Sequence, residues 1–452
     1  MILGPTFEEM RDPSRIDEGI RARLKDADKL DPVRLFDIRW IEDDGNVRHW
    51  VVPPALTGVD ATIVLLLGWR FPTGAHKVGP AYSCVVEDQL RGVMTPGEHT
   101  LVFPSTGNYG IGGAWVGPRM GYRSLVVLPE EMSAERFEKI RGYGAEIIAT
   151  PGCESNVKEI YDEVKRLRAR PEIRVANQFE AWGNYRFHYG VTGPAAERVS
   201  EQLGFGGKVS AFVSAMGSAG TIAAGDYLKA QHGTAIAGLE PVQCPTLYNV
   251  GYGGHRIEGI GDKHVTWIHN VGNMDLLACV DDETCVRALQ LLQEGGEWLR
   301  RELGMTDADL AAYQCQIGVS GICNLIGAIK TARALQLGKG ELVVTVATDG
   351  FDRYPSVLEH LEEREGPQTE AVALRRLGAL QNTDTSWVLD GSREVRERWH
   401  NQKYFTWIEQ QKRSIEELHA LKSQDFWAGE RAKIAEVNQA IRDARGDLAN
   451  WG

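Results

Sequence analysis

The chain has 452 residues, of which 43% are hydrophobic and 25% are charged, a composition typical of soluble globular proteins. This length predicts two or three domains rather than one small core. The net charge of −12 disfavours nucleic acids and anionic membranes as partners, because either would need a basic face. No apolar run is long enough to span a bilayer.

The seven cysteines are scattered, odd in number and include no Cys-x-x-Cys pair. This pattern favours reduced thiols in the cytoplasm and disfavours a zinc cluster, so we expect no metal site. The first residues lack a basic region followed by an apolar stretch, and we therefore expect no export signal.

Residues 1–60 are mixed and polar, and we interpret them as a lead-in that packs on the core. Residues 37–50 suggest a hairpin whose turn is Asp43-Asp44-Gly45-Asn46.

From residue 61 to about 355, short apolar runs alternate with amphipathic segments of helical length. The runs that predict strands are 61–67, 100–103, 124–128, 146–149, 209–214, 235–239 and 341–347. The segments that predict helices are 77–90, 134–142, 157–169, 195–203, 284–303 and 323–335. Such alternation predicts βαβ units and parallel sheets, with the site at the carboxyl ends of the strands.

Residues 356–452 change to charged, tryptophan-bearing sequence that predicts helices without obvious strands. The aromatic residues of this extension have three possible uses: packing on the core, forming a subunit interface or covering the mouth of a site. Core packing is the favoured interpretation.

Lys77 lies at the start of a predicted helix, after a strand and a Pro-Thr-Gly turn. At such a position burial lowers the pKa of a lysine, and a neutral amine attacks an aldehyde carbon. Alone, the motif fits a surface lysine at a helix N-terminus better.

Two loops offer anion sites. The first follows a predicted strand and comprises Ser105, Thr106, Gly107, Asn108, Tyr109 and Gly110. The second precedes a predicted helix and comprises Gly217, Ser218, Ala219, Gly220 and Thr221. Small residues at a helix N-terminus present free N–H donors, which suit a carboxylate or a single phosphate. Neither loop matches a dinucleotide or nucleoside triphosphate motif.

Together these features resemble the pyridoxal-phosphate enzymes of the cysteine synthase and tryptophan synthase β group, over residues 61 to about 355. The resemblance implies an α/β fold with two open, twisted, mostly parallel sheets flanked by helices. It also implies a substrate-binding subdomain at about 95–195 within the 61–355 core, and a homodimer. The 356–452 helices are an addition to this pattern.

The resemblance also implies roles for individual residues. Lys77 is similar to the Schiff-base lysine, and the 217–221 loop to the phosphate loop. Asn108 corresponds to a contact of the cofactor's phenolic oxygen. Substrate binding is implied for Ser105, Thr106, Gly107, Tyr109, Gln178, Gly259 and Asp262.

Three departures from the family pattern bear on the reaction. Asp262-Lys263-His264 adds ionisable groups that are either a specificity or acid–base element or a solvated turn. The partner of the pyridine nitrogen is either Thr348, which we prefer, or Asp349. Tyr109 stands where many relatives have a small residue, and we expect it to reshape the pocket.

The expected reaction is pyridoxal 5'-phosphate-dependent β-replacement or β-elimination on an amino acid, through an aminoacrylate. The alternatives are a dehydratase or ammonia-lyase acting on a hydroxy or diamino acid, and a catalytically silent homologue that binds the cofactor or a partner protein.

Overall fold

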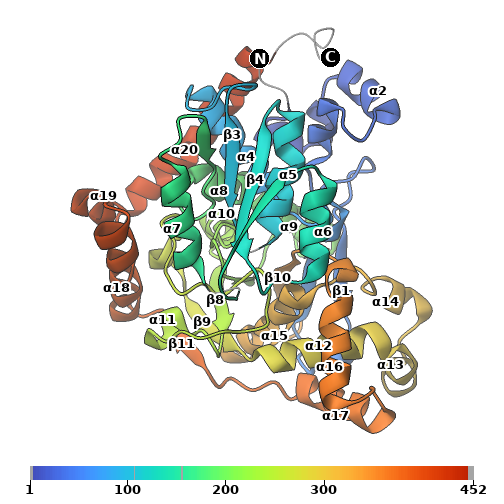
Figure 1. Ribbon diagram of the computed structural model, residues 1–452. Coiled ribbons are helices and arrows are strands. Elements are labelled where there is room, and N and C mark those ends of the chain that lie inside the picture. Colours follow the sequence, from blue (N-terminus) through green and yellow to red (C-terminus); the bar gives the residue numbers. More distant parts are fainter. Residues whose placement is uncertain (1–3, 106, 154–155, 446–452) are drawn as a thin grey trace.

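Two twisted, mostly parallel sheets form the frame of the protein in the computed structural model, which describes residues 4–105, 107–153 and 156–445 (Figure 1). The larger sheet has seven strands in the order β1-β2-β10-β7-β8-β9-β11. Its strands are β1 (His49–Val52), β2 (Thr62–Leu67), β7 (Ala211–Ala215), β8 (Ala235–Pro241), β9 (Leu276–Val280), β10 (Leu342–Ala347) and β11 (Val388–Asp390). The two edge strands, β1 and β11, are antiparallel to their neighbours, and the other pairs are parallel.

The smaller sheet has four parallel strands in the order β5-β4-β3-β6. These are β3 (Thr100–Pro104), β4 (Arg123–Pro129), β5 (Glu146–Thr150) and β6 (Ile173–Val175). Helices α5 (Asn108–Arg119), α6 (Ala134–Gly142) and α7 (Val157–Leu167) pack against it. The predicted α/β fold with two mostly parallel sheets is confirmed.

The central strands are buried on both faces, which explains their unbroken apolar sequence. β2 lies between β1 and β10, and Leu67 pairs with Ala347 where β2 and β10 end. β10 also pairs with β7 in parallel. The carboxyl ends of β2, β7 and β10 therefore meet at one edge of the larger sheet.

Helices cover both sheets. The remaining helices of the first 355 residues include α1 (Phe7–Arg11), α2 (Glu18–Asp26), α3 (Pro54–Thr57), α4 (Val78–Leu90), α8 (Trp182–Phe187), α9 (Gly193–Gln202), α10 (Ala223–His232), α11 (Thr246–Asn249), α12 (Asp282–Glu294), α13 (Gly296–Leu303), α14 (Asp307–Ala311) and α15 (Val319–Ala334). The predicted 284–303 helix is two helices, because the chain breaks at Gly295 between α12 and α13.

The lead-in and the extension both depart from the prediction. The 43–46 turn is present, with an antiparallel bridge between Ile41 and Val47, but β1 belongs to the larger sheet. The extension was predicted to lack strands, and this is wrong for β11, which pairs with β9. Three residues at a half-exposed edge leave little periodicity to detect.

Five helices form most of the extension: α16 (Pro355–Glu365), α17 (Glu370–Gln381), α18 (Arg393–Asn401), α19 (Ile415–Ala420) and α20 (Gln424–Ala444). Figure 1 shows α18, α19 and α20 along one side of the molecule and α16 and α17 at the far end.

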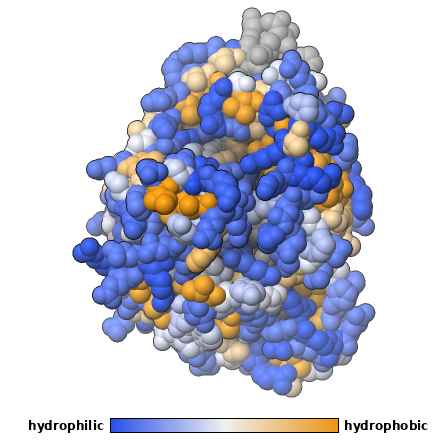
Figure 2. Space-filling model, turned by 60° about the vertical axis from the view of Figure 1, so that its left-hand side comes forward, coloured by the Kyte–Doolittle hydropathy of each residue, from blue (hydrophilic) through white to orange (hydrophobic). Residues whose placement is uncertain are grey.

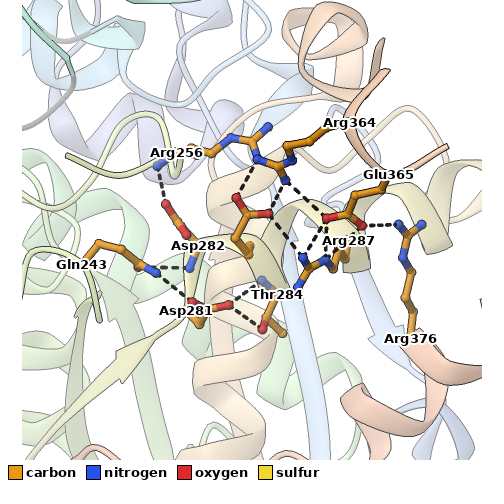
Figure 3. A network of polar contacts seen from close by, with 10 residues as sticks. Gln243, Arg256, Asp281, Asp282, Thr284, Arg287, Arg364, Glu365 and Arg376 are labelled. Atoms are coloured by element: carbon orange, nitrogen blue, oxygen red, sulfur yellow. Dashed lines mark hydrogen bonds and ion pairs between the residues drawn. The ribbon is translucent and has the colours of Figure 1, made fainter. Parts of the chain in front are cut away.

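Ion pairs attach α16 and α17 to α12 (Figure 3). Arg287 of α12 contacts Glu365 at 2.7 Å, and Glu365 also contacts Arg376 of α17 at 3.3 Å. Arg364 contacts Glu283 at 2.5 Å. These ion pairs therefore fix α16 to α12, and α17 to α16.

The visible face in Figure 2 is largely hydrophilic, with hydrophobic residues in separate patches. None of the helices in the described part of the chain is long and apolar enough to cross a membrane.

Candidate active site

Lys77 lies where the ends of β2 and β10 meet. It directly precedes α4, and its Nζ donates to Ser218 Oγ at 3.2 Å. The turn before it is fixed to the segment after β10, because the His76 N–H donates to the Thr348 carbonyl oxygen at 3.1 Å and Ala75 forms a bridge with Asp349. The lysine therefore reaches across to the 217–221 loop from a rigid support.

The 217–221 loop connects β7 to α10, as the sequence predicts. The backbone N–H groups of Gly217 to Thr221 find no acceptor among the described residues. Close packing requires two of its glycines: a Cβ at Gly220 would lie 1.9 Å from Asn184 Oδ1, and one at Gly217 would lie 2.8 Å from the Gly259 carbonyl oxygen. Free donors at the start of a helix suit an anion.

A small cavity lies between these elements. Its lining includes six of the residues singled out from the sequence: Lys77, Gly217, Ala219, Thr221, Gly259 and Thr348. The structure thus brings the lysine and the glycine-rich loop together, although they are about 140 positions apart in the chain.

A side chain of the loop before α5 stabilises the loop and the first turn of the helix. Ser105 Oγ accepts the N–H groups of Gly107 and Gly110, at 2.9 and 2.8 Å. Gly107 has a φ of 149°, and Thr106 lies outside the described residues. The hydroxyl of Ser105 therefore caps α5, while its role in substrate binding stays a prediction.

Tyr109 is in the interior, where its hydroxyl donates to the Ala176 carbonyl oxygen at 3.0 Å and its ring packs on Phe103. Only 2% of the residue is exposed. Burial raises the pKa of the phenol well above its ordinary value. Its hydroxyl is thus engaged by the core rather than by the cavity lined by Lys77.

Gln178 is buried, and its Nε2 donates to the Pro104 carbonyl oxygen at 3.4 Å. Asn184, which sequence reasoning missed, donates from Nδ2 to the Gln178 carbonyl oxygen at 2.9 Å and to Ser218 Oγ at 3.0 Å. The Asn184 amide on α8 therefore positions both Gln178, the predicted contact of the substrate carboxylate, and the 217–221 loop.

Asn108 and Asp349 form a buried pair. Asn108 Nδ2 donates to Asp349 Oδ2 at 2.6 Å, and the Tyr354 hydroxyl donates to the same oxygen at 2.9 Å. Arg136 and Arg353 place guanidinium nitrogens 3.7 and 4.0 Å from it. Asn108 Oδ1 and Asp349 Oδ1 are buried without a hydrogen-bond partner in the described part of the chain. Arg136 and Tyr354 were given no role from the sequence.

Two buried histidines lie behind Lys77. His76 Nε2 lies 3.3 Å from Thr221 Oγ1, and its ring contacts that of His188 edge-on at 5.1 Å. Burial, followed by the nearby Lys77 charge, lowers the pKa of His76 well below its ordinary value. A neutral histidine thus supports the 217–221 loop, a role that was not assigned to His76 from the sequence.

The Asp262-Lys263-His264 segment divides into buried and exposed parts. Asp262 is only 6% exposed, and burial raises the pKa of its carboxyl to about 7, while the Lys77 charge opposes that rise. His264 Nε2 lies 3.2 Å from the Tyr161 hydroxyl, and burial lowers the pKa of His264 to about 4. Lys263 faces outward. A wholly solvated turn is therefore excluded.

Comparison with known families identifies the class of protein to which this lysine-centred α/β site belongs. The family described as "Pyridoxal-phosphate dependent enzyme" matches residues 53–349. The chain belongs to this family and is a pyridoxal-phosphate-dependent enzyme.

Curated relatives include cysteine synthase 3 of Caenorhabditis elegans, 31% identical over 315 residues, which are 69% of this chain and 86% of the relative. Cysteine synthase of Staphylococcus aureus (strain N315) is 30% identical over 298 residues, covering 66% of this chain and 88% of the relative.

Solved structures share the fold. The O-acetylserine dependent cystathionine beta-synthase from Helicobacter pylori aligns with a TM-score of 0.58 and 25% identity, over 68% of this chain and 94% of that one. Cysteine synthase from Entamoeba histolytica aligns with a TM-score of 0.62 and 21% identity, over 76% and 95%, and supports the fold alone.

The residues present fit pyridoxal phosphate. The cofactor needs an amine for its aldehyde, donors for its phosphate and polar groups for its ring oxygen and nitrogen. Lys77 would supply the first, the N–H groups of the 217–221 loop would supply the second, and Asn108 with Thr348 or Asp349 would supply the third. The buried amide and carboxylate oxygens without partners are consistent with a ligand beside them.

Proposed function

We propose that the protein catalyses β-replacement or β-elimination on an α-amino acid. The observation that carries the proposal is the meeting of Lys77 with the donor-rich 217–221 loop in one cavity. The relatives named cysteine synthase and the O-acetylserine dependent cystathionine beta-synthase support the choice of reaction class.

Lys77 has two tasks in this proposal. It anchors the cofactor at rest, and its freed amine removes the proton from the substrate's Cα. When bound, pyridoxal phosphate holds the substrate's amino group and takes up the electron pair released from the Cα–H bond. The Ser218 hydroxyl, 3.2 Å from Nζ, orients the amine.

The loop before α5 and Gln178 orient the substrate carboxylate, so that the Cα–H bond lies perpendicular to the cofactor ring. For the pyridine nitrogen we favour Thr348, which lines the cavity. The Oδ2 atom of Asp349 is already held by Asn108 and Tyr354.

A dehydratase or ammonia-lyase is the second candidate, and the buried Asp262 carboxyl favours it, because hydroxyl and amino groups leave more readily once protonated.

Product analysis after mixing the enzyme with serine, O-acetylserine, threonine or cysteine tests the proposal and separates β-replacement from the elimination reactions, that of the second candidate included. A synthase forms a β-substituted amino acid when a thiol is supplied. A lyase forms a keto acid and ammonia whether or not a thiol is present. Absence of turnover, and of any spectral change of the bound cofactor, with all four amino acids would contradict the proposal and favour a silent homologue.

We also infer a homodimer in the cytoplasm. Among the described residues, Cys84, Cys244, Cys279, Cys285, Cys315 and Cys323 form no disulfide, as suits a reducing compartment. Light scattering of the purified enzyme measures the assembly, and a monomer would contradict this inference.

A further inference from the structure

Asp262 lines a second small cavity beside the one that contains Lys77. Gly217 and Ala219 line both cavities, so the 217–221 loop forms a wall of each. The positive charge of Lys77 acts on the Asp262 carboxyl. The carboxyl therefore belongs to the surroundings of the reactive lysine.

The backbone around Asp262 is fixed, whereas its carboxyl is not used structurally. The Gly261 N–H donates to the Met216 carbonyl oxygen at 2.8 Å, and Thr246 Oγ1 donates to the Asp262 carbonyl oxygen at 2.9 Å. Asp262 Oδ2 is buried, and it has no hydrogen-bond partner in the part of the chain that the structure describes. A buried polar atom without a partner implies a missing ligand or a chemical role.

Glu240, in the same cavity, shows what a structural carboxylate looks like here. Burial raises the pKa of its carboxyl to about 7 as well. Its two oxygens, however, accept the N–H groups of Leu247 and Tyr248 at 3.0 and 2.8 Å. The two carboxyl groups are equally buried, but only that of Asp262 remains free for a substrate.

The other titratable groups near Asp262 do not take over its role. Burial lowers the pKa of His264 to about 4 and that of His269 to about 3, so both are neutral near pH 7. Burial raises the pKa of Cys244 and, well above its ordinary value, that of Tyr161, so both stay protonated. His255 holds the Gly261 carbonyl oxygen through Nε2 at 3.0 Å, and burial lowers its pKa to about 4. Lys77 is the charged neighbour.

We propose that Asp262 is the acid–base residue for the group on Cβ, and that the substrate is an α-amino acid whose β-substituent is a hydroxyl or a thiol. This inference rests on the proposed function and deepens it.

The proton balance divides between two residues. In elimination, the Lys77 amine takes the Cα proton, the electron pair of that bond forms the Cα–Cβ double bond, and the Cβ–X bond breaks with its pair passing to X. Asp262 gives its proton to X, which leaves as H–X, and becomes a carboxylate. In replacement, an incoming H–Nu gives its proton to this carboxylate as Nu bonds to Cβ, and Lys77 returns its proton to Cα.

The substrate class follows from the leaving group. An acetoxy or chloride group leaves as a stable anion and needs no acid. A hydroxyl or thiol leaves from carbon far more readily when it is protonated, so a buried acid at Cβ is useful only for such substrates.

The test compares the wild-type holoenzyme with Asp262→Asn, using serine, cysteine and β-chloroalanine as substrates. We expect kcat with serine or cysteine to fall about 10²–10⁴-fold, the usual contribution of a general acid, while kcat with β-chloroalanine changes less than about tenfold. With the wild type, kcat for serine or cysteine should decline as pH rises through about 7, because Asp262 must be protonated.

Lys263→Gln is the matched control, since it removes a charge from the exposed neighbouring residue. The visible spectrum of the bound cofactor and the thermal unfolding of each variant verify its folding, and Asp262→Ser replaces the asparagine variant if that fails to fold. Infrared spectroscopy without substrate gives a separate readout: a protonated carboxyl band at pH 6 that Asp262→Asn lacks.

Equal losses with all substrates, no loss with any, or no infrared difference would overturn the inference. A wild type that uses O-acetylserine and β-chloroalanine but neither serine nor cysteine would overturn it as well, while leaving the proposed function intact. Failure of the proposed function has a different signature, namely no turnover of any of these amino acids.

Discussion

The candidate active site and the buried tryptophans of the C-terminal extension treat their polar groups in opposite ways. Among the candidate site residues, the loop N–H groups and one buried oxygen each of Asn108, Asp349 and Asp262 lack partners among the described residues. In the extension, Trp399 Nε1 donates to the Leu247 carbonyl oxygen at 3.1 Å, and Trp407 Nε1 donates to that of Val265 at 2.8 Å. The contrast separates groups kept for a ligand from groups used for attachment.

Lys403 completes this attachment. Its Nζ donates to the carbonyl oxygens of Trp267 and His269 at 2.9 and 2.7 Å, and burial lowers its pKa well below the ordinary value. The carbonyl groups bound by Trp399, Lys403 and Trp407 all belong to residues 247–269, the segment that carries Asp262. The family match ends at residue 349, yet the added helices hold a wall of the second cavity, the one lined by Asp262, in place.

Arg136→Met should have the largest effect on stability. The substitution removes the buried cation that Asp349 and Glu258 share, although Arg353 remains near Asp349, and such a loss typically costs about 3–5 kcal/mol of the free energy of unfolding. Chemical denaturation measures it. Arg393→Met, at a 91% exposed side chain on α18, should change the free energy by less than about 0.5 kcal/mol. Similar costs for both would remove the distinction between cavity and surface.

Gly220→Ala should weaken cofactor binding more than folding. The new Cβ would lie 1.9 Å from Asn184 Oδ1, which displaces the loop and costs about 1–3 kcal/mol, or roughly 5- to 150-fold in the dissociation constant of pyridoxal phosphate. Fluorescence titration of the cofactor-free protein gives the constant. Gly378→Ala is the control, because nothing lies within 4 Å of its added Cβ; unchanged affinity in Gly220→Ala would contradict the placement of the loop.

Trp407→Phe should disturb the wall of the second cavity, because Trp407 of the extension holds Val265, which lines that cavity. It removes the N–H bonded to Val265 and leaves that carbonyl without this donor, at a cost of about 1–3 kcal/mol. We expect a lower thermal midpoint and a higher KM, while Trp387→Phe at a 38% exposed residue changes neither. A purely peripheral extension predicts an unchanged KM.

Glu365→Gln should have the smallest effect. Its hydrogen bond with Arg287 is the leading cause that lowers the pKa of Glu365, to about 2. A depressed acid stabilises the folded state above its unfolded pKa of about 4.3 and loses this contribution as pH falls toward 2. The pair is partly exposed, so we expect less than about 1 kcal/mol near pH 7 and no difference from wild type at pH 2. A difference in the free energy of unfolding between wild type and Glu365→Gln that grows toward pH 2 would contradict a stabilising ion pair between Glu365 and Arg287.

Much of the fold was predictable because its strands are continuous apolar runs between helices. β6 and β11 escaped detection, since runs of three residues carry too little periodicity to identify a strand. β9 escaped as well, although it is as long as β3 and β5, which were predicted. β11, moreover, depends on an edge that only the folded sheet provides.

The candidate site was predictable where chemistry follows from local sequence, as for Lys77 and the 217–221 loop. Asn184, Arg136 and Tyr354 were not, because their roles come from contacts across the fold. Asn184 bonds to a residue 34 positions away, and Arg136 to one 218 positions away. The same holds for Tyr109, whose interior hydroxyl bond to Ala176 no local pattern predicts.

The most direct test of the account is the position of the covalent bond to the cofactor. Borohydride reduction of the holoenzyme, followed by peptide mapping with mass spectrometry, should find the pyridoxyl group on Lys77. Lys77→Ala should lose both the label and turnover, whereas Lys339→Ala, at an exposed residue before β10, should keep both. A label on another lysine, or full activity in Lys77→Ala, would contradict the account.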